Sequence, residues 1–143
     1  MAIFDFSKAF DSVPHRRLLA KLDFYGIRNS NLHWISSLLS ARKQRVTLNG
    51  TQSSWHSVIY GVPQDTVLGP LLFLLYINDI VTDISSEIRL FADDCIVYRT
   101  ITDQSDCTTL QADIDILLNC SNTWKMKFNP SRCHIPMYRS PTQ

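Results

Sequence analysis

The sequence predicts a mixed α/β fold of the α+β type, in which helices cover one face of a small antiparallel sheet. Two observations predict the sheet. "AIFDF", residues 2–6, is typical of a buried strand, and "RLFADDCIVYR", residues 89–99, has two apolar runs on either side of two aspartates. A third observation predicts the helices, because apolar residues recur at helical spacing between and after these strands. This order of elements is typical of a layered domain.

Length and composition indicate one globular domain over residues 1–143. Hydrophobic residues make up 45% of the chain and charged residues 19%, which is enough apolar side chain for a core. The formal net charge is only +1. Since proteins that grip a nucleic-acid backbone are usually more basic, either the partner is not nucleic acid or the most basic surface lies outside this sequence.

The cysteine pattern and the apolar runs point to an intracellular protein without a membrane segment. The four cysteines form no C-x-x-C pair and no zinc spacing with the histidines, so we expect free thiols in a reducing compartment. The first residues have no secretory signal pattern. The longest apolar stretch, "VLGPLLFLLYI", has 11 residues and is too short to cross a bilayer. The choice between nucleus and cytoplasm stays open.

The first half of the chain predicts two helices and a hairpin. Pro14 opens a helical pattern that Gly26 ends. A second helix follows, with Ser30 as its expected cap. "RVTLNGTQSSWHSV" then predicts a hairpin that turns at Asn49 and Gly50.

The second half predicts a loop, two helices and a short tail strand. Two glycines and two prolines make residues 60–70 a loop, and Pro70 begins a helix that is apolar almost all round and therefore buried. Residues 106–127 form an amphipathic helix after the aspartate hairpin. In the tail, residues 132–143, Pro136 restricts any strand to a sheet edge.

The aspartate pair in "RLFADDCIVYR" allows two interpretations. Asp93 and Asp94 fall where the strands must turn, and Asp suits turns, although a hairpin usually takes Asn-Gly or Asp-Gly there. A third carboxylate, Asp5, ends the first buried strand. If that strand lies beside the hairpin, Asp5 and Asp93 converge at one edge of the sheet and repel each other unless a cation neutralises them. Carboxylate oxygens are ligands that Mg²⁺ accepts together with substrate phosphates.

Three segments carry a family resemblance. "AIFDFSKAFDSVPH", "GVPQDTVLGPLLFLLYINDI" and "FADDCIVYR" resemble, in this order and spacing, segments of the reverse transcriptases of non-LTR (LINE or jockey-like) retrotransposons. "SARKQRVTLNG" and "TWKMKFNPSRCHI" resemble the segments between and after them, so the likeness covers nearly the whole chain. It implies a polymerase palm and an RNA-directed DNA polymerase, a nucleotidyltransferase that copies an RNA template onto a DNA primer from deoxynucleoside triphosphates.

The resemblance also implies roles for individual residues. Asp5 and Asp93 match the aspartates that hold two catalytic Mg²⁺ ions, for which Mn²⁺ can substitute, and Asp94 matches the neighbouring carboxylate. Three further residues match nucleotide- or template-binding positions: the aromatic under the incoming sugar that blocks a 2′-hydroxyl, the residue of the "VPQ" loop that contacts nucleotide and template, and the late basic residue near the triphosphate. In this sequence they are Phe10, Gln64 and Arg132.

Each role has a structural alternative. Phe10 can be a core aromatic, and Gln64 can be an ordinary polar loop residue. Asp11 is a candidate cap for the helix that follows it. The basic run of Arg42, Lys43 and Arg45 can contact phosphates or can be a solvated helix end. Cys95 and Cys133 are expected to be inert packing residues.

The sequence departs from the family in two ways. Typical members have "VPQGS" where this chain has "VPQDT", so Asp65 loses the freedom of a glycine to adopt positive φ and adds a negative charge near substrate phosphates. Arg132 stands where the family often has lysine, and a guanidinium keeps the charge but cannot donate its proton. We also expect the family's fingers before Met1 and thumb after Gln143 to be missing, as in a palm-region fragment.

Two interpretations of function follow. In the first, the chain is the palm of an RNA-directed DNA polymerase. In the second, it is a catalytically dead relic, or a small α/β module that binds nucleic acid or protein weakly. The three aspartates favour the first for ancestry, whereas Asp65 and the missing flanks favour the second for present activity. We therefore expect little activity from the isolated fragment. The particular element and its target site stay open.

Overall fold

The computed structural model describes residues 1–135 and divides the chain into two compact units. The sheet unit joins Met1–Ala9 to the described residues from Asn78 onward, and the helical unit is Phe10–Ile77. Each unit has its own core, so each is described by itself.

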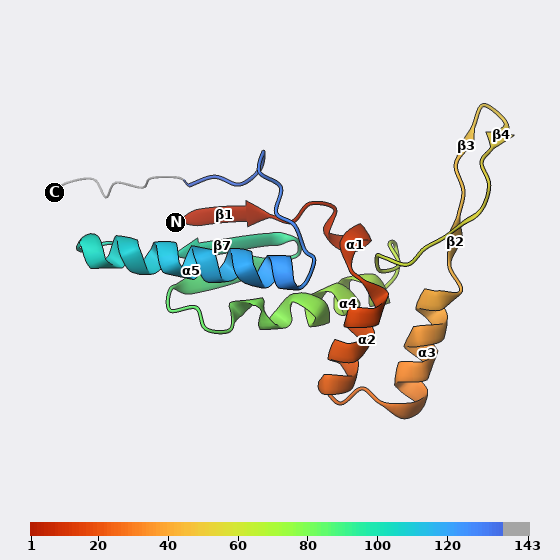
Figure 1. Cartoon of the computed structure of the whole chain (residues 1–143), viewed down its shortest axis with the longest axis horizontal. Helices are drawn as coiled ribbons and strands as arrows, with labels where there is room; N and C mark the ends of the chain where they lie inside the picture. The colour runs from red at the N-terminus through yellow and green to blue at the C-terminus, as the bar shows by residue number, and fades with distance from the viewer. Residues whose placement is uncertain (136–143) are drawn as a thin grey trace. The chain divides into compact units, whose positions relative to one another are not determined.

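The sheet unit contains the three strands that the sequence predicts. They are β1 (Ala2–Asp5), β6 (Glu87–Phe91) and β7 (Asp94–Tyr98), and they lie in the order β1-β7-β6 with antiparallel pairing throughout (Figure 1). β7 is therefore the central strand, although it lies far from β1 in the sequence. Its β-branched and apolar residues suit a position with a neighbour on each side.

One face of this sheet is packed and the other is more open. Directly paired residues share a face, and Phe4 pairs with Cys95 while Ala2 pairs with Val97; all four are buried. The alternate residues of β7, Asp94, Ile96 and Tyr98, belong to the other face and are only half-buried. The long helix α5 (Gln104–Thr123) contacts β7 and lies along the sheet in Figure 1. Its Ile114 and Leu117 are buried. The prediction of a sheet with helical cover on one face is thus confirmed for this unit.

The limits of α5 differ from the predicted 106–127 for identifiable reasons. Asp103 caps the helix, because its side chain accepts hydrogen bonds from the backbone N–H groups of Ser105 and Asp106, and Asp106 completes a capping box. At the other end Trp124 is the C-cap and Lys125 takes a φ of 61°, which ends the helical hydrogen bonding. The short 3₁₀ helix η1 (Asn78–Val81) contacts α5 before β6 begins.

After α5 the chain returns along the free edge of β1. Phe6 pairs with Phe128 and Ile3 with His134 in isolated antiparallel bridges, and the Phe6 and Phe128 rings stack at 4.5 Å. The predicted edge strand in the tail is thus reduced to a single bridge at His134 within the described chain. The remainder of that prediction, from residue 136, lies outside the described residues.

The helical unit is built on α2 (His15–Phe24), α3 (Asn29–Ser40) and α4 (Leu68–Ile77), after a single turn of helix, α1 (Ala9–Ser12). α2 contacts both α3 and α4. The buried apolar side chains that form its core are Val13, Leu18, Leu22, Ile35, Leu39, Val62, Leu72, Phe73, Tyr76 and Ile77. Lys21 is also buried, with its ammonium group against the Tyr76 carbonyl oxygen and 4.8 Å from the centre of the Tyr76 ring.

The predicted ends of α2 are confirmed and the predicted cap of α3 is wrong. Pro14 is the N-cap residue of α2, and Gly26 follows its end with a φ of 87°. For α3 the N-cap is Arg28, which makes no side-chain capping bond, so Ser30 lies inside the helix. A serine near a helix start is a frequent cap, but here the helix already begins at Asn29, one residue before Ser30.

α4 begins at Leu68 instead of Pro70 and is less buried than predicted. Pro70 lies in the first turn, where its missing N–H costs no helical hydrogen bond. Leu71 and Leu74 are 50% and 46% exposed, so the prediction of burial on all sides is wrong. Within its unit α4 packs mainly against α2, with Phe10 of α1 on its Phe73, and this cover leaves part of the helix surface open.

The helical unit also carries the predicted hairpin, here called the basic hairpin (residues 42–58). Its pairs are β2 (Lys43–Gln44) with β5 (His56–Ser57), and β3 (Thr47–Leu48) with β4 (Thr51–Gln52). Asn49 and Gly50 take φ values of 48° and 78°, as a type I′ turn requires. The predicted turn at Asn49 and Gly50 is confirmed (Figure 1).

The cysteines and the membrane prediction have simple outcomes. All four cysteines are free thiols. Cys95 is fully buried on β7, and burial raises the pKa of its thiol to about 12, which makes it the inert packing residue that we expected. Among the helices of residues 1–135, none combines the length and apolar character needed to cross a membrane.

Candidate functional site

The aspartates that the sequence singled out lie at one end of the sheet. Asp5 is the last residue of β1, and its cross-strand partner is Asp94, the first residue of β7. The backbone N–H of Phe6 donates to the Asp93 carbonyl oxygen at 3.1 Å, so the residues after Asp5 and before Asp94 are also joined. Directly opposite residues in an antiparallel pair have Cβ atoms roughly 5 Å apart on the same face. Asp5 and Asp94 therefore share one face at this edge.

The turn between β6 and β7 lies one residue earlier than predicted. Phe91 pairs with Asp94, so the two central residues are Ala92 and Asp93, and Asp94 already belongs to a strand. Ala92 has a φ of 52°, whereas Asp93 is not in the positive-φ region, which is the pattern of a type II′ turn. Glycine is the usual residue at the first position of such a turn. Ala92 is strained there, beside the aspartates of this hairpin, which we call the carboxylate hairpin (β6, β7 and their turn).

Arg132 lies beside Asp5. Its Nη1 atom is 3.4 Å from an Asp5 carboxylate oxygen, and the Asp5 side chain is only 11% exposed while that of Arg132 is 69% exposed. Asn129 holds this segment in place: its N–H donates to the Asp5 carbonyl oxygen at 2.8 Å, and its side chain accepts from Ser131. Two opposed aspartates repel each other, and the guanidinium offsets part of this repulsion.

The donor set suits a hard divalent cation that also binds substrate. In residues 1–135 no three aspartate, glutamate, histidine or cysteine side chains are grouped so that they alone could hold a metal ion. The three aspartates therefore form no complete cage. Mg²⁺ usually takes only one or two protein carboxylates and fills its other positions with water and phosphate oxygens. The pair of Asp5 and Asp94 supplies two carboxylates and leaves room for water and phosphate oxygens, which fits this kind of Mg²⁺ binding.

The other two predicted site residues belong to the helical unit. Gln64 donates from Nε2 to an Asp11 carboxylate oxygen at 2.7 Å. The predicted alternative for Asp11, a cap on the following helix, is wrong, because Pro14 is the N-cap of α2 and no side chain caps it. Phe10 packs on Phe73 with ring centres 4.7 Å apart and is half-buried. That contact fixes the ring, and its role toward a sugar stays a prediction.

The loop that carries Gln64 is tightly folded. Asp65 takes a φ of 55°, so the expected conflict between a left-handed position and a non-glycine residue is present. Thr66 donates to the Pro63 carbonyl oxygen at 2.9 Å and accepts from the Gly69 N–H at 3.0 Å. Gly69 lies so close to the Pro63 carbonyl that a Cβ atom would collide with it. The loop conformation is thus fixed on both sides of Asp65.

Three contributions to these arrangements were missed by the sequence interpretation. Ala92 carries backbone strain, Asn129 holds Arg132 beside Asp5, and Asp11 holds Gln64. Alanine gives no signal for positive φ, so Ala92 could not be found. The "NPS" turn of residues 129–131 is a recognisable Asx-turn pattern and was the available signal for Asn129.

Comparisons with known proteins identify the family of the chain. The family described as "Reverse transcriptase (RNA-dependent DNA polymerase)" matches residues 1–142. The "Probable RNA-directed DNA polymerase from transposon X-element" of Drosophila melanogaster is 31% identical over 140 residues, which is 90% of this chain. The "RNA-directed DNA polymerase from mobile element jockey" is 30% identical over 92% of the chain in Drosophila melanogaster and 31% over 90% in Drosophila funebris.

These relatives are much longer than the sequence described here. The chain spans 15% of the length of each of the three. The matches nevertheless run almost from end to end of this chain and include both strand ends that carry the aspartates. The chain belongs to the reverse transcriptase family.

Proposed function

We propose that this chain is the palm segment of a non-LTR RNA-directed DNA polymerase. The observation that carries the proposal is the direct pairing of Asp5 with Asp94 at the ends of the adjacent strands β1 and β7, with Asp93 in the turn that joins β6 to β7. The matched family and the names of the relatives support the same reaction class. The reaction is template-directed nucleotidyl transfer, with an RNA template, a DNA primer and deoxynucleoside triphosphates as substrates.

In this proposal the carboxylates hold two Mg²⁺ ions together with the triphosphate. Asp5 and Asp93 are the metal ligands and Asp94 is the neighbouring carboxylate. Bound there, the ions would supply activation of the attacking hydroxyl and stabilisation of the leaving pyrophosphate. The protein's own contribution is position: β1 and β7 fix the carboxylates, and burial of Asp5 keeps its side chain from rotating freely.

The remaining site residues act on the nucleotide. Arg132, which is largely exposed beside Asp5, is placed to exchange that carboxylate for a triphosphate oxygen. Gln64, oriented by Asp11, contacts the nucleotide and template through its carboxamide. Phe10, fixed against Phe73, lies under the sugar and excludes a 2′-hydroxyl.

A chimera tests the proposal. Residues 1–135 replace the matching segment of an active relative, and primer extension is measured on an RNA template. Asp93→Asn and Asp5→Asn should each reduce Mg²⁺-dependent extension by at least about a hundredfold, the scale of lost transition-state charge stabilisation. Asp115→Asn, an exposed carboxylate on α5 that accepts from Gln111, is the matched control and should leave extension unchanged. Equal rates for all variants would contradict the assignment.

The 143 residues expressed alone should not extend a primer at a useful rate. Catalysis of this kind depends on positioning the triphosphate and the duplex, and the chain spans 15% of the length of its relatives. Mg²⁺-dependent incorporation by the isolated chain that Asp93→Asn abolishes would show this expectation to be wrong.

One observation favours the second function, a remnant without catalytic activity that binds nucleic acid or protein. Asp65 adds a carboxylate to the Gln64 loop and occupies a left-handed position that suits glycine. The chimera distinguishes the two functions. A remnant would stay inactive in the chimera even with Asp65→Gly, whereas a palm that is impaired only by Asp65 would recover.

A further inference from the structure

Among residues 1–135, no helix or strand outside the basic hairpin covers its residues 43–57. Every residue from 43 to 57 is exposed. Three large apolar side chains are among them, with Val46 69%, Leu48 70% and Trp55 58% exposed. A two-stranded hairpin by itself is marginally stable in water, and exposed apolar side chains on it commonly mark a surface that binds something.

A bulge in this hairpin places an arginine on a tryptophan. β2 pairs Gln44 with His56, and Val46 and Ser53 exchange hydrogen bonds further along the hairpin. One residue on the first strand, Arg45, therefore opposes two on the second, Ser54 and Trp55, which is the arrangement of a β-bulge. The Arg45 guanidinium lies 4.5 Å from the centre of the Trp55 ring. The bulge thus presents a planar cation and an aromatic ring together, both open to solvent.

The charge around the hairpin has one sign. No aspartate or glutamate occurs between Asp23 and Asp65, although the whole chain is almost neutral. Arg42 donates to the Gly61 carbonyl oxygen at 3.2 Å and fixes the base of the hairpin. Lys43 and Arg45 are exposed beyond it. A surface without acidic groups complements a polyanion and repels none of its charges.

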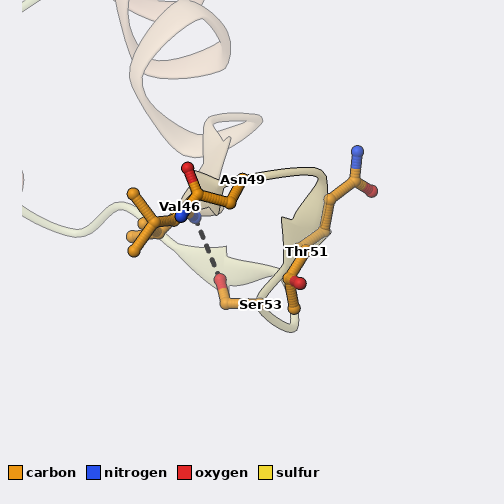
Figure 2. A pocket seen from close by; sticks show the side chains of 6 residues that line it. Val46, Asn49, Thr51 and Ser53 are labelled. Atoms are coloured by element: carbon orange, nitrogen blue, oxygen red, sulfur yellow. Dashed lines mark hydrogen bonds between the residues drawn. The ribbon is translucent and has the colours of Figure 1, made fainter.

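The tip of the hairpin has an open hollow that is lined by Val46 and Leu48 and by the polar side chains of Asn49, Thr51, Gln52 and Ser53. Its volume is about 430 Å³. Figure 2 shows Val46 beside Asn49, Thr51 and Ser53, with the Val46 N–H donating to the Ser53 hydroxyl. Hydroxyl and amide groups beside apolar side chains suit a nucleobase, because a base has flat apolar faces and polar edges.

We propose that the basic hairpin binds single-stranded nucleic acid, with phosphates at Lys43 and Arg45 and a base stacked at Trp55. The proposal rests on the proposed function, which supplies a single-stranded template and a primer, and adds a contact surface separate from the aspartates. Stacking on an aromatic ring and neutralisation of phosphates are the usual combination for strand binding without sequence preference. The alternative occupant, a protein, is an outcome of the test.

The test measures binding of fluorescein-labelled 20-nucleotide RNA and DNA strands to the full chain by fluorescence anisotropy, in EDTA. Arg45→Ala should weaken binding about fivefold and reduce the steepness of the salt dependence by about 0.7, as loss of one phosphate contact to a single strand does. Trp55→Ala should weaken binding at least about fivefold with the salt dependence unchanged, and Trp55→Phe should restore most of it. Arg28→Ala removes the same charge outside the hairpin and should bind as the unmodified chain does.

The outcomes separate this proposal from the polymerase proposal and from a protein partner. EDTA prevents catalysis, so binding through the hairpin is measured whether or not the chimera extends primers. Binding of either strand supports the proposal, and the tighter strand identifies template RNA or primer DNA as its source. No binding, or binding by Arg45→Ala and Trp55→Ala that is as tight as that of the unmodified chain, overturns it. It is also overturned if these variants instead abolish self-association in sedimentation while oligonucleotide affinity is unchanged, because the hairpin is then a protein contact.

Discussion

The chain contains two antiparallel hairpins whose turn residues differ in how well they suit positive φ. The basic hairpin turns through Asn49 and Gly50, residue types that accept the positive φ of their positions. The carboxylate hairpin turns through Ala92 and Asp93, and Ala92 has a φ of 52° without the freedom of glycine. The favourable turn belongs to the exposed hairpin, and the strained turn belongs to the hairpin whose strand β7 pairs with β1 and contacts α5.

The difference between the two turns reflects how much packing stabilises each hairpin. In the basic hairpin little besides the turn and a few backbone hydrogen bonds favours the paired state, so the turn residues must suit their geometry. In the carboxylate hairpin Cys95 and Val97 are fully buried, and that packing outweighs a strained residue. Positions 92–94 are consequently free to carry aspartates where turn stability alone would prefer glycine.

The same substitution, valine to alanine, should have very different effects in the two hairpins. Val97→Ala removes buried methyl groups and should lower the free energy of unfolding by about 2 kcal/mol. Val46→Ala removes the same groups from a side chain that is 69% exposed and should change the free energy of unfolding by less than about 0.5 kcal/mol. Urea unfolding of both variants measures the difference. Equal losses would mean that the basic hairpin is packed after all.

The next effect concerns Asp65 in the Gln64 loop, a strained residue outside any strand pairing. In the chimera, Asp65→Gly should raise primer extension at least about tenfold, which corresponds to roughly 1.4 kcal/mol. Relief of a positive-φ position contributes about 1 kcal/mol, and loss of a carboxylate near phosphates contributes a similar amount. Asp65→Asn separates the two, because it deletes the charge and tolerates left-handed geometry. If neither substitution changes extension, the loop does not approach the nucleotide and the role of Gln64 fails with it.

Alkaline pH should weaken the sheet unit through Cys95. The folded pKa of about 12 lies above the ordinary value of 9.0 because the thiol is buried, so the folded state keeps a proton that the unfolded state releases. Stability is therefore intact below pH 9 and falls by up to about 1.4 kcal/mol per pH unit as the pH rises from 9 toward 12. Cys95→Ala should remove this slope in urea unfolding. Cys107→Ala, at an exposed thiol, should keep it.

The smallest expected effects come from substitutions at the positive-φ positions of the two turns. Ala92→Gly should raise the free energy of unfolding by about 0.5–1 kcal/mol, because glycine accepts the φ of 52°. Gly50→Ala should weaken the basic hairpin by about 1 kcal/mol, since its φ is 78°. Urea unfolding measures the first, and amide hydrogen exchange of residues 43–57 measures the second. A loss of stability in Ala92→Gly would show that Ala92 is not strained in solution.

Sequence patterns located the elements well where periodicity and turn chemistry agreed. β1, α2, the Asn49–Gly50 turn and the two strands around the aspartates are all present. The errors lie at boundaries. α5 starts two residues early because Asp103 and Asp106 cap each other, and the carboxylate turn is displaced because strand register, set by packing across β7, decides it.

The candidate site was predictable only in part. Asp5 and the aspartate pair were identified because carboxylates at strand ends have a chemical meaning. The contacts of Asp11 with Gln64 and of Arg132 with Asp5 join residues far apart in the sequence, and no local pattern encodes them. The site roles themselves remain predictions, which the chimera addresses.

The order of the strands affects how the chain can fold as it is synthesised. β1 is made first, but its partner β7 and the segment at Phe128 follow the whole of the helical unit. The ribosome adds roughly 5–20 residues per second, so several seconds pass between the synthesis of β1 and that of β7. During this time the backbone of β1 lacks its β7 partner. The helical unit, whose contacts are continuous in sequence, can collapse during that interval. Such late closure gives the sheet a high contact order, which predicts slow folding and leaves the edges of β1 open to aggregation until β7 is made.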